Sequence, residues 1–251
     1  MKSSVFALSA CLALALGSNA FATNLIYNGD FQRGVISFNT DYAYGRLYEG
    51  PALAEGSFMF VTQARDVHFN WLGFYDHTFG TSSGLYFVAN CESDAAIVWE
   101  SYPIVVSQAH TPYRFEAWIA KVYASDPSPP VLTFQVGNGI ASWTDLGTTS
   151  SLNGVSGGVW LHTYVDCEFE SAGTYNVSLR NANNSLVGND LGLDDIYFGL
   201  RSDAPSFGSD AGTAIPTTFS PVAVPEPSTY AMALAGLACG GYSMLRRRRA
   251  R

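Results

Sequence analysis

Basic residues are scarce in this 251-residue chain, except at its C-terminal end. Residues 23–223 contain seven Lys and Arg against twenty Asp and Glu, a net charge of −13, whereas the whole chain has a net charge of −8. A surface of this sign repels nucleic acid and anionic lipid and attracts cations. Nucleic-acid binding is therefore excluded, because no basic patch exists outside the last residues.

Cysteine is also rare, with four in the chain. Cys11 and Cys239 lie in apolar stretches at the two ends, so Cys91 and Cys167 are the pair left between them. In an oxidising compartment two cysteines can form one disulfide, and we expect a Cys91–Cys167 bond. Two buried free thiols are the alternative, because spacing alone does not show that the Cα atoms approach within ~7 Å.

Catalytic motifs are missing as well. The four histidines have no metal-site spacing, and no nucleophile motif accompanies them. Glu100 and Glu116 are the imaginable acid pair of a glycoside hydrolase, but on strands we expect both to point to solvent. The sequence thus predicts a protein that is not an enzyme and has no catalytic residues.

The N-terminal residues have the pattern of an export signal. Lys2 precedes an apolar stretch, residues 5–16, and Ala20-Phe21-Ala22 matches the small-residue rule for signal cleavage. We predict a signal peptide over residues 1–22, with cleavage after Ala22; cleavage after Ala20 is the alternative.

The C-terminal 28 residues combine a short polar motif, an apolar span and a basic cluster. Val224-Pro225-Glu226-Pro227 precedes the 16 apolar residues 230–245, and Arg dominates residues 246–251. As a helix the span is about 24 Å long, enough for a transmembrane helix if the flanking arginines snorkel. The basic cluster should stay on the cytoplasmic side.

This tail resembles the PEP-CTERM sorting tails of Gram-negative bacteria. The resemblance implies export through the inner membrane, anchoring there by the C-terminal helix, and recognition by an exosortase before release to the cell surface or beyond. An ordinary anchor helix is the alternative, but it would not require the Pro-Glu-Pro placement.

Between the two ends the chain reads as β-strands. In residues 113–119, Tyr113, Phe115, Ala117 and Ile119 alternate with other residues, so they share one face. Breakers separate such segments, and no window has a helical period. We predict an all-β sandwich or jelly roll over residues 23–201 and a flexible linker over 202–223. The candidate strands are 57–63, 85–89, 96–102, 113–119, 132–136, 159–166, 175–179 and 193–200.

Three short segments resemble those of carbohydrate-binding modules and MAM domains. They are residues 24–32 (NLIYNGDFQ), Asp76-His77-Thr78 with the strand after it, and Leu193-Asp194-Asp195-Ile196. The resemblance implies a galactose-binding-like jelly roll. It also implies that Asp30, Asp76 and Asp195 converge on one structural Ca²⁺, whose hard oxygen ligands carboxylates supply. Relatives often have Glu at the position of Gln32; alternatively, these aspartates only shape turns.

Aromatic residues in loop-like segments are the candidate sugar contacts. Trp71, Tyr75 and Trp143 stand beside amide and carboxylate residues, a mixture that suits sugar faces and hydroxyls; core packing is the alternative for each ring. We therefore expect a non-enzymatic surface or matrix protein that binds polysaccharide and is linked to exopolysaccharide or biofilm. A structural or adhesive protein without a sugar site is the second hypothesis, and a glycoside hydrolase is a distant third.

Overall fold

The computed structural model describes residues 24–45, 52–124, 127–138, 142–149 and 152–205, together with the backbone of strand Thr213–Ile215. The predicted signal peptide (1–22) and the predicted tail (224–251), with its apolar span and arginine cluster, lie outside these residues. Within the described part, no helix has the length and apolar character needed to cross a membrane.

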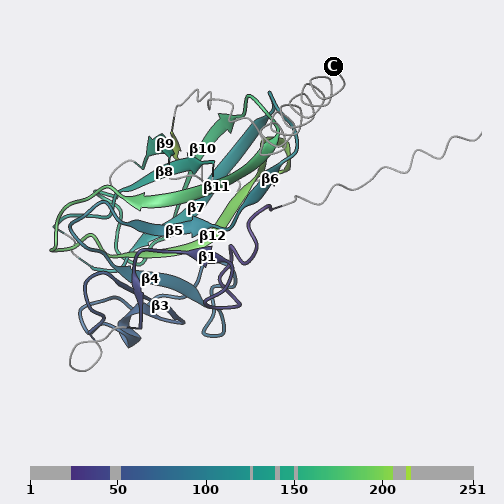
Figure 1. Ribbon diagram of the computed structural model, residues 1–251. Helices are drawn as coiled ribbons and strands as arrows, with labels where there is room; N and C mark the ends of the chain where they lie inside the picture. The colour runs from purple at the N-terminus through teal and green to yellow at the C-terminus, as the bar shows by residue number, and fades with distance from the viewer. Residues whose placement is uncertain are drawn as a thin grey trace, which may run out of the picture.

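The described chain forms two β-sheets that pack against each other, so the predicted all-β sandwich is confirmed (Figure 1). The six-stranded sheet has the order β1-β5-β11-β8-β9, with β6 paired to β11, and the seven-stranded sheet has the order β13-β10-β7-β12-β4-β3-β2. The first contains β1 (Phe38–Asn39), β5 (Ile97–Ser101), β6 (Ile104–Val106), β8 (Leu132–Gly137), β9 (Trp143–Thr148) and β11 (Gly173–Asn181). The second contains β2 (Ala43–Tyr44), β3 (Ser57–Val61), β4 (Tyr86–Asn90), β7 (Pro112–Lys121), β10 (Leu161–Glu168), β12 (Leu191–Leu200) and β13 (Thr213–Ile215), and the two 3-10 helices are η1 (Ala64–Asp66) and η2 (Arg201–Asp203).

Period-two alternation places the core. The four apolar residues of β7 predicted to share a face all belong to one buried cluster between the sheets. Phe115 of β7 meets Phe134 of β8, in the opposite sheet, with ring centroids 4.8 Å apart in an edge-to-face contact. Each such buried ring stabilises the fold by about 1.5–3 kcal/mol, an upper estimate because unfolded chains already bury some surface.

The N-terminal segment runs beside the last long strand of the domain. Leu25 N donates to Phe198 O over 2.7 Å, and Ile196 N donates to Gly29 O over 2.9 Å. The Asn24 side chain bridges the same segments, accepting from Phe198 N and donating to Ile196 O. Two segments distant in sequence therefore lie side by side, the N-terminal one along the second half of β12.

The predicted disulfide is contradicted: Cys91 and Cys167 are both free and buried. Cys91 directly follows β4, and Cys167 lies on β10. Strands β7 and β12 lie between β4 and β10 in the same sheet. Three strand spacings of ~4.8 Å place the Cα atoms of the two cysteines at least roughly 14 Å apart, twice the Cα separation that a disulfide spans.

Two segments differ from the sequence predictions. Residues 142–145, predicted to be loop-like, begin with Ser142 and continue as strand β9 at the edge of the six-stranded sheet. Within the predicted flexible linker, β13 pairs in parallel with β10, Thr213 opposite Thr163. Both are edge strands, which gain their order from one neighbour and carry little pattern of their own.

Candidate functional site

The outer face of the six-stranded sheet carries a row of polar side chains. Asn39, Glu100, Ser178, Gln135 and Asp145 stand opposite one another on β1, β5, β11, β8 and β9. Their sequence neighbours Trp99, Leu179, Val136 and Leu146 belong to the core. The row therefore faces away from the core, and we call it the polar row.

Hydrogen bonds fix the side chains of the polar row. Ser178 Oγ donates to Gln135 Oε1 over 3.1 Å, and Gln135 Nε2 donates to Asp145 Oδ1 over 2.7 Å. Asn176, beside the row on β11, donates to Glu100 Oε1 over 3.3 Å. Desolvation, and then the charge of Asp41, raises the pKa of Glu100. Because Ser178, Gln135 and Asn176 are buried, they act from below by orienting Asp145 and Glu100. These two carboxylates are the more accessible groups of the row and suit the hydroxyl groups of a neutral ligand.

Trp143 flanks the polar row. It stands opposite Gly137 on β8, which in turn stands opposite Asn176 on β11. A Cβ atom at Gly137 would lie 2.9 Å from the Trp143 ring, so the ring lies over the glycine. The predicted sugar contact at Trp143 is therefore a half-buried strand residue beside amides and carboxylates, with Gly137 providing the room for its ring.

The other two predicted sugar contacts are not on this face. Trp71 has only 4% of its surface exposed and packs against His68, while its Nε1 donates to Asp190 over 3.3 Å, so its predicted sugar contact is wrong. Tyr75 is 41% exposed, and its carbonyl accepts from Trp160 Nε1, just before β10 of the seven-stranded sheet. Trp71 and Tyr75 therefore do not join Trp143 in one site. The ring of Trp71 is buried, where an aromatic ring contributes most to stability.

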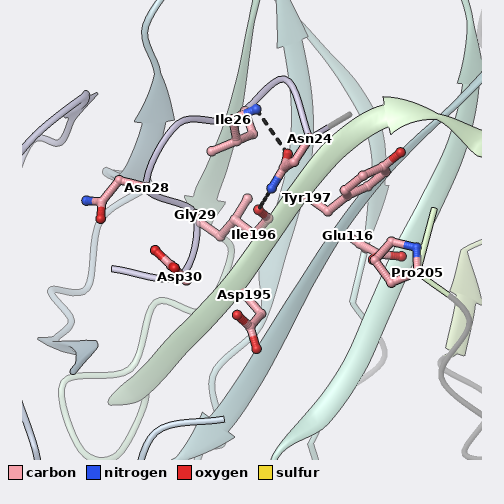
Figure 2. A pocket seen from close by; sticks show the side chains of 10 residues that line it. All are labelled: Asn24, Ile26, Asn28, Gly29, Asp30, Glu116, Asp195, Ile196, Tyr197 and Pro205. Atoms are coloured by element: carbon pink, nitrogen blue, oxygen red, sulfur yellow. Dashed lines mark hydrogen bonds between the residues drawn. The ribbon is translucent and has the colours of Figure 1, made fainter. Parts of the chain in front are cut away.

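A pocket of about 370 Å³ brings together two of the three predicted calcium ligands (Figure 2). Asp30, from the N-terminal segment, and Asp195, from β12, both line it, together with Glu116 of β7. Asp76 does not line this pocket; its carboxylate accepts from the Phe79 and Thr81 amides within its own loop. Among the described residues, no group of three or more acidic, His or Cys side chains is placed to hold a metal ion. The calcium site stays a prediction.

A β-bulge directs Asp195 out of the sheet. On β12, Asp194 stands opposite Trp118 and Tyr197 opposite Glu116, so Asp195 and Ile196 together face one residue of β7. Asp195 has a φ of 43°, in the left-handed region that non-glycine residues rarely adopt. Its carboxylate contacts His77 Nδ1 at 2.6 Å. Burial, and then the charge of Asp195, raises the pKa of neighbouring Asp194 to about 8.

Glu100 and Glu116, both expected to point to solvent, lie in different surroundings. Glu100 is half-buried on the outer face of the six-stranded sheet, whereas Glu116, expected to point to solvent, is only 1% exposed. Glu116 Oε2 lies 3.1 Å from His162 Nε2 on the neighbouring strand β10. Sequence analysis did not single out Asn176, Gln135 or Ser178, although polar residues alternate with apolar ones along β8 and β11.

Solved structures similar to this chain include carbohydrate-binding modules and a phage protein. A family 16 carbohydrate-binding module has 15% identity and a TM-score of 0.41, covering 70% of this chain and 99% of that one. The xylan-binding module CBM22-1 of Paenibacillus barcinonensis Xyn10C has 13% identity and a TM-score of 0.35, covering 51% and 79%. The enzymatically active domain of bacteriophage CBA120 tailspike protein 4 has 10% identity and a TM-score of 0.42; the match covers 70% of this chain but only 21% of the phage protein.

Because these TM-scores are below 0.5, the fold assignment depends on the sheet topology and not on the likeness. No curated protein matches the chain. Residues 223–249 match the PEP-CTERM protein-sorting motif, as predicted from the sequence. The chain therefore carries the sorting motif of an exported protein.

Proposed function

We propose that this chain is an exported surface or matrix protein that binds polysaccharide, without hydrolysing it, on the outer face of its six-stranded sheet. The observation that supports this most is the polar row, which crosses five strands next to Trp143. Sugar rings offer hydroxyl groups around an apolar C–H face, so a binding site for them combines amides, carboxylates and an aromatic ring.

The charge of the protein restricts the class of glycan. Glu100 and Asp145 are acidic members of the row, and Arg180, 3.5 Å from Asp145, is the basic residue paired with it. The exported part of the chain is strongly acidic overall. Neutral or cationic polysaccharides are therefore the proposed ligands, since an anionic chain would be repelled.

The sorting motif supplies the context. Val224, Pro225, Glu226 and Pro227 lie within the matched residues. We propose that an exosortase of a Gram-negative bacterium recognises them while the tail anchors the protein in the inner membrane. The processed protein then reaches the cell surface, where binding of exopolysaccharide would link it to biofilm.

Hydrolysis by the two glutamates considered above is disfavoured by their placement. Glu100 lies on β5 of one sheet and Glu116 on β7 of the other. Packed sheets are ~10 Å apart, and both carboxylates point away from the core, so their separation exceeds the ~9.5 Å upper limit for a catalytic pair. This pair therefore does not flank one glycosidic bond.

The test is affinity electrophoresis of the exported protein against a panel of neutral, cationic and anionic polysaccharides. Trp143→Ala and Asp145→Ala should each remove most of the retardation while leaving the melting temperature near that of the wild type, because Trp143 is half-buried and Asp145 is exposed. Phe69→Ala is the matched control, because Phe69 is 67% exposed but does not belong to this face. Equal retardation of all variants would place the sugar site elsewhere on the protein, and no retardation of the wild type would favour the structural or adhesive hypothesis instead.

A further inference from the structure

We propose that hydrogen-bond donors, and not a metal ion, hold the loop Asp76–Gly84 against the bulge of β12. The loop and the carboxylates of Asp76, Asp194 and Asp195 form a unit that we call the clamp. This proposal does not depend on polysaccharide binding. It concerns the place where the sequence resemblance implied calcium, and it assigns that place a different chemistry.

Donors from the loop occupy both carboxylates of the bulge. Asp194 Oδ2 accepts from the backbone amides of His77, at 2.7 Å, and Thr78, at 3.2 Å, while its Oδ1 accepts from Asp195 N. Asp195 Oδ1 accepts from Thr78 Oγ1 over 2.8 Å, and its Oδ2 from His77 Nδ1 over 2.6 Å. Because a carboxylate is an acceptor, His77 Nδ1 carries the hydrogen in this contact.

The imidazole of His77 is held in place from the side of the sheet. Its ring stacks on Trp118 of β7, with centroids 3.7 Å apart and planes 17° apart. Trp118 stacks in turn on His162 of β10, at 4.9 Å, and His162 contacts Glu116. Aromatic packing on one side and the Asp195 carboxylate at Nδ1 thus set the position of His77 as a hydrogen-bond donor.

The third carboxylate and its surroundings follow the same chemistry. Asp76 is buried, and its two oxygens accept from Phe79 N, at 2.8 Å, and Thr81 N, at 3.3 Å. Gly84 provides the space, because a Cβ atom there would lie about 2.1 Å from the Asp76 carboxylate. All six carboxylate oxygens of the clamp therefore accept a hydrogen bond from a described residue.

The hydrogen bonds of Gln32 require an amide at this position, where relatives often have Glu. Its Nε2 donates to Leu85 O over 2.9 Å and its Oε1 accepts from Leu85 N over 3.1 Å, so it pairs with both backbone groups at the end of the loop. A glutamate would lose the donor. Calcium takes 6–8 oxygen ligands, whereas here N–H groups of His77 and Gln32 donate hydrogen bonds where further oxygen ligands would be required. The donor set therefore does not fit the ion.

The clamp positions exposed aromatic residues. Phe79 lies within the loop and is 60% exposed, and Tyr75 is the residue immediately before the loop. With donors in place of an ion, the display of these rings does not depend on the calcium concentration outside the cell. His77 is thus a positioning residue for this surface.

The first arm of the test uses the full exported chain without substitutions. Its melting temperature and the hydrogen-exchange protection of the His77, Thr78, Phe79 and Thr81 amides should be the same in chelator and in millimolar calcium. A higher melting temperature with calcium, or loss of this protection in chelator, would overturn the proposal.

The second arm removes single donors. His77→Ala and Thr78→Ala should each lower the melting temperature by roughly 3–10 °C and expose the loop amides first. Ser82→Ala is the matched control, because Ser82 is exposed in the same loop and is not one of the donors to the three carboxylates. Unchanged protection in Thr78→Ala would contradict the proposal even if His77→Ala failed to fold.

The substitution Gln32→Glu should change the melting temperature in opposite directions, depending on whether hydrogen-bond donors or a metal ion hold the clamp. If donors hold the clamp, the substitution lowers the melting temperature with or without calcium, because Leu85 O loses its partner. If a metal site exists, the added carboxylate raises the melting temperature in calcium. The second result would overturn the proposal.

Discussion

Glu116 Oε2 and His162 Nε2 lie 3.1 Å apart on the neighbouring strands β7 and β10, and both side chains are buried. Polar groups in this position are tolerated because each offers the other a hydrogen-bond partner, and removing one takes this bond from a desolvated group. Glu116 also lines the pocket to which Asp30 and Asp195 belong.

Removing both members of this pair should destabilise the domain by less than the sum of the two single removals. Glu116→Leu or His162→Leu alone should lower the free energy of unfolding by about 1–3 kcal/mol. The double substitution should cost less than the sum of the single ones, because both single substitutions break the same contact. Urea unfolding of the four proteins measures this cycle, and strict additivity would show that the contact contributes nothing.

A side chain at Gly137 should impair the polar face without damaging the core. Gly137→Ala places a Cβ atom 2.9 Å from the Trp143 ring, which must then move. We expect a loss of polysaccharide binding comparable to that of Trp143→Ala. Gly173→Ala on β11 is the control, because its Cβ would make an ordinary 3.4 Å contact with Tyr175. Full binding by Gly137→Ala in affinity electrophoresis would show that the position of the Trp143 ring does not matter for binding.

The thiols of Cys91 and Cys167 should be unreactive in the folded protein. Burial raises the pKa of Cys167 to about 12 and raises that of Cys91 as well, so neither forms a reactive thiolate at neutral or mildly alkaline pH. Alkylation between pH 7 and pH 9 should label neither thiol in the native protein and both after unfolding without reductant. Absence of labelling after unfolding would restore the disulfide.

Trp71 and Tyr75 should respond oppositely to truncation, although they are four residues apart. Trp71→Ala removes a buried ring and its bond to Asp190, so unfolding should become about 3–5 kcal/mol easier. Tyr75→Ala should change stability by no more than about 0.5 kcal/mol, because Tyr75 is 41% exposed and belongs to neither buried cluster. Chemical denaturation of both variants checks this, and similar losses would place Tyr75 in the core too.

Processing should depend on the short motif within the matched tail. Replacing Pro225, Glu226 and Pro227 by alanines should leave an unprocessed, membrane-bound form in a host that has an exosortase. Alanines at Ser228 and Thr229 serve as the control. Fractionation and mass measurement of the released protein distinguish the outcomes, and equal release of both variants would contradict a role for the motif.

The sequence by itself determined the strand class and the sorting motif. Alternation along residues 113–119 places Tyr113, Phe115, Ala117 and Ile119 in the core, because side chains of a strand point to opposite faces whatever its neighbours are. The C-terminal motif is equally local, since its recognition depends on the order of residues in one short segment.

Only the tertiary structure decided which side chains meet. Strand order separates Cys91 from Cys167, and register aligns Asn39 with Asp145 through three other strands. Local pattern did not distinguish buried Trp71 from exposed Tyr75, since both stand in the same aromatic segment. Likewise, the donors that His77 and Gln32 bring to Asp195 and Leu85 come from segments distant in sequence. Such pairings depend on long-range register and burial, which no single segment encodes.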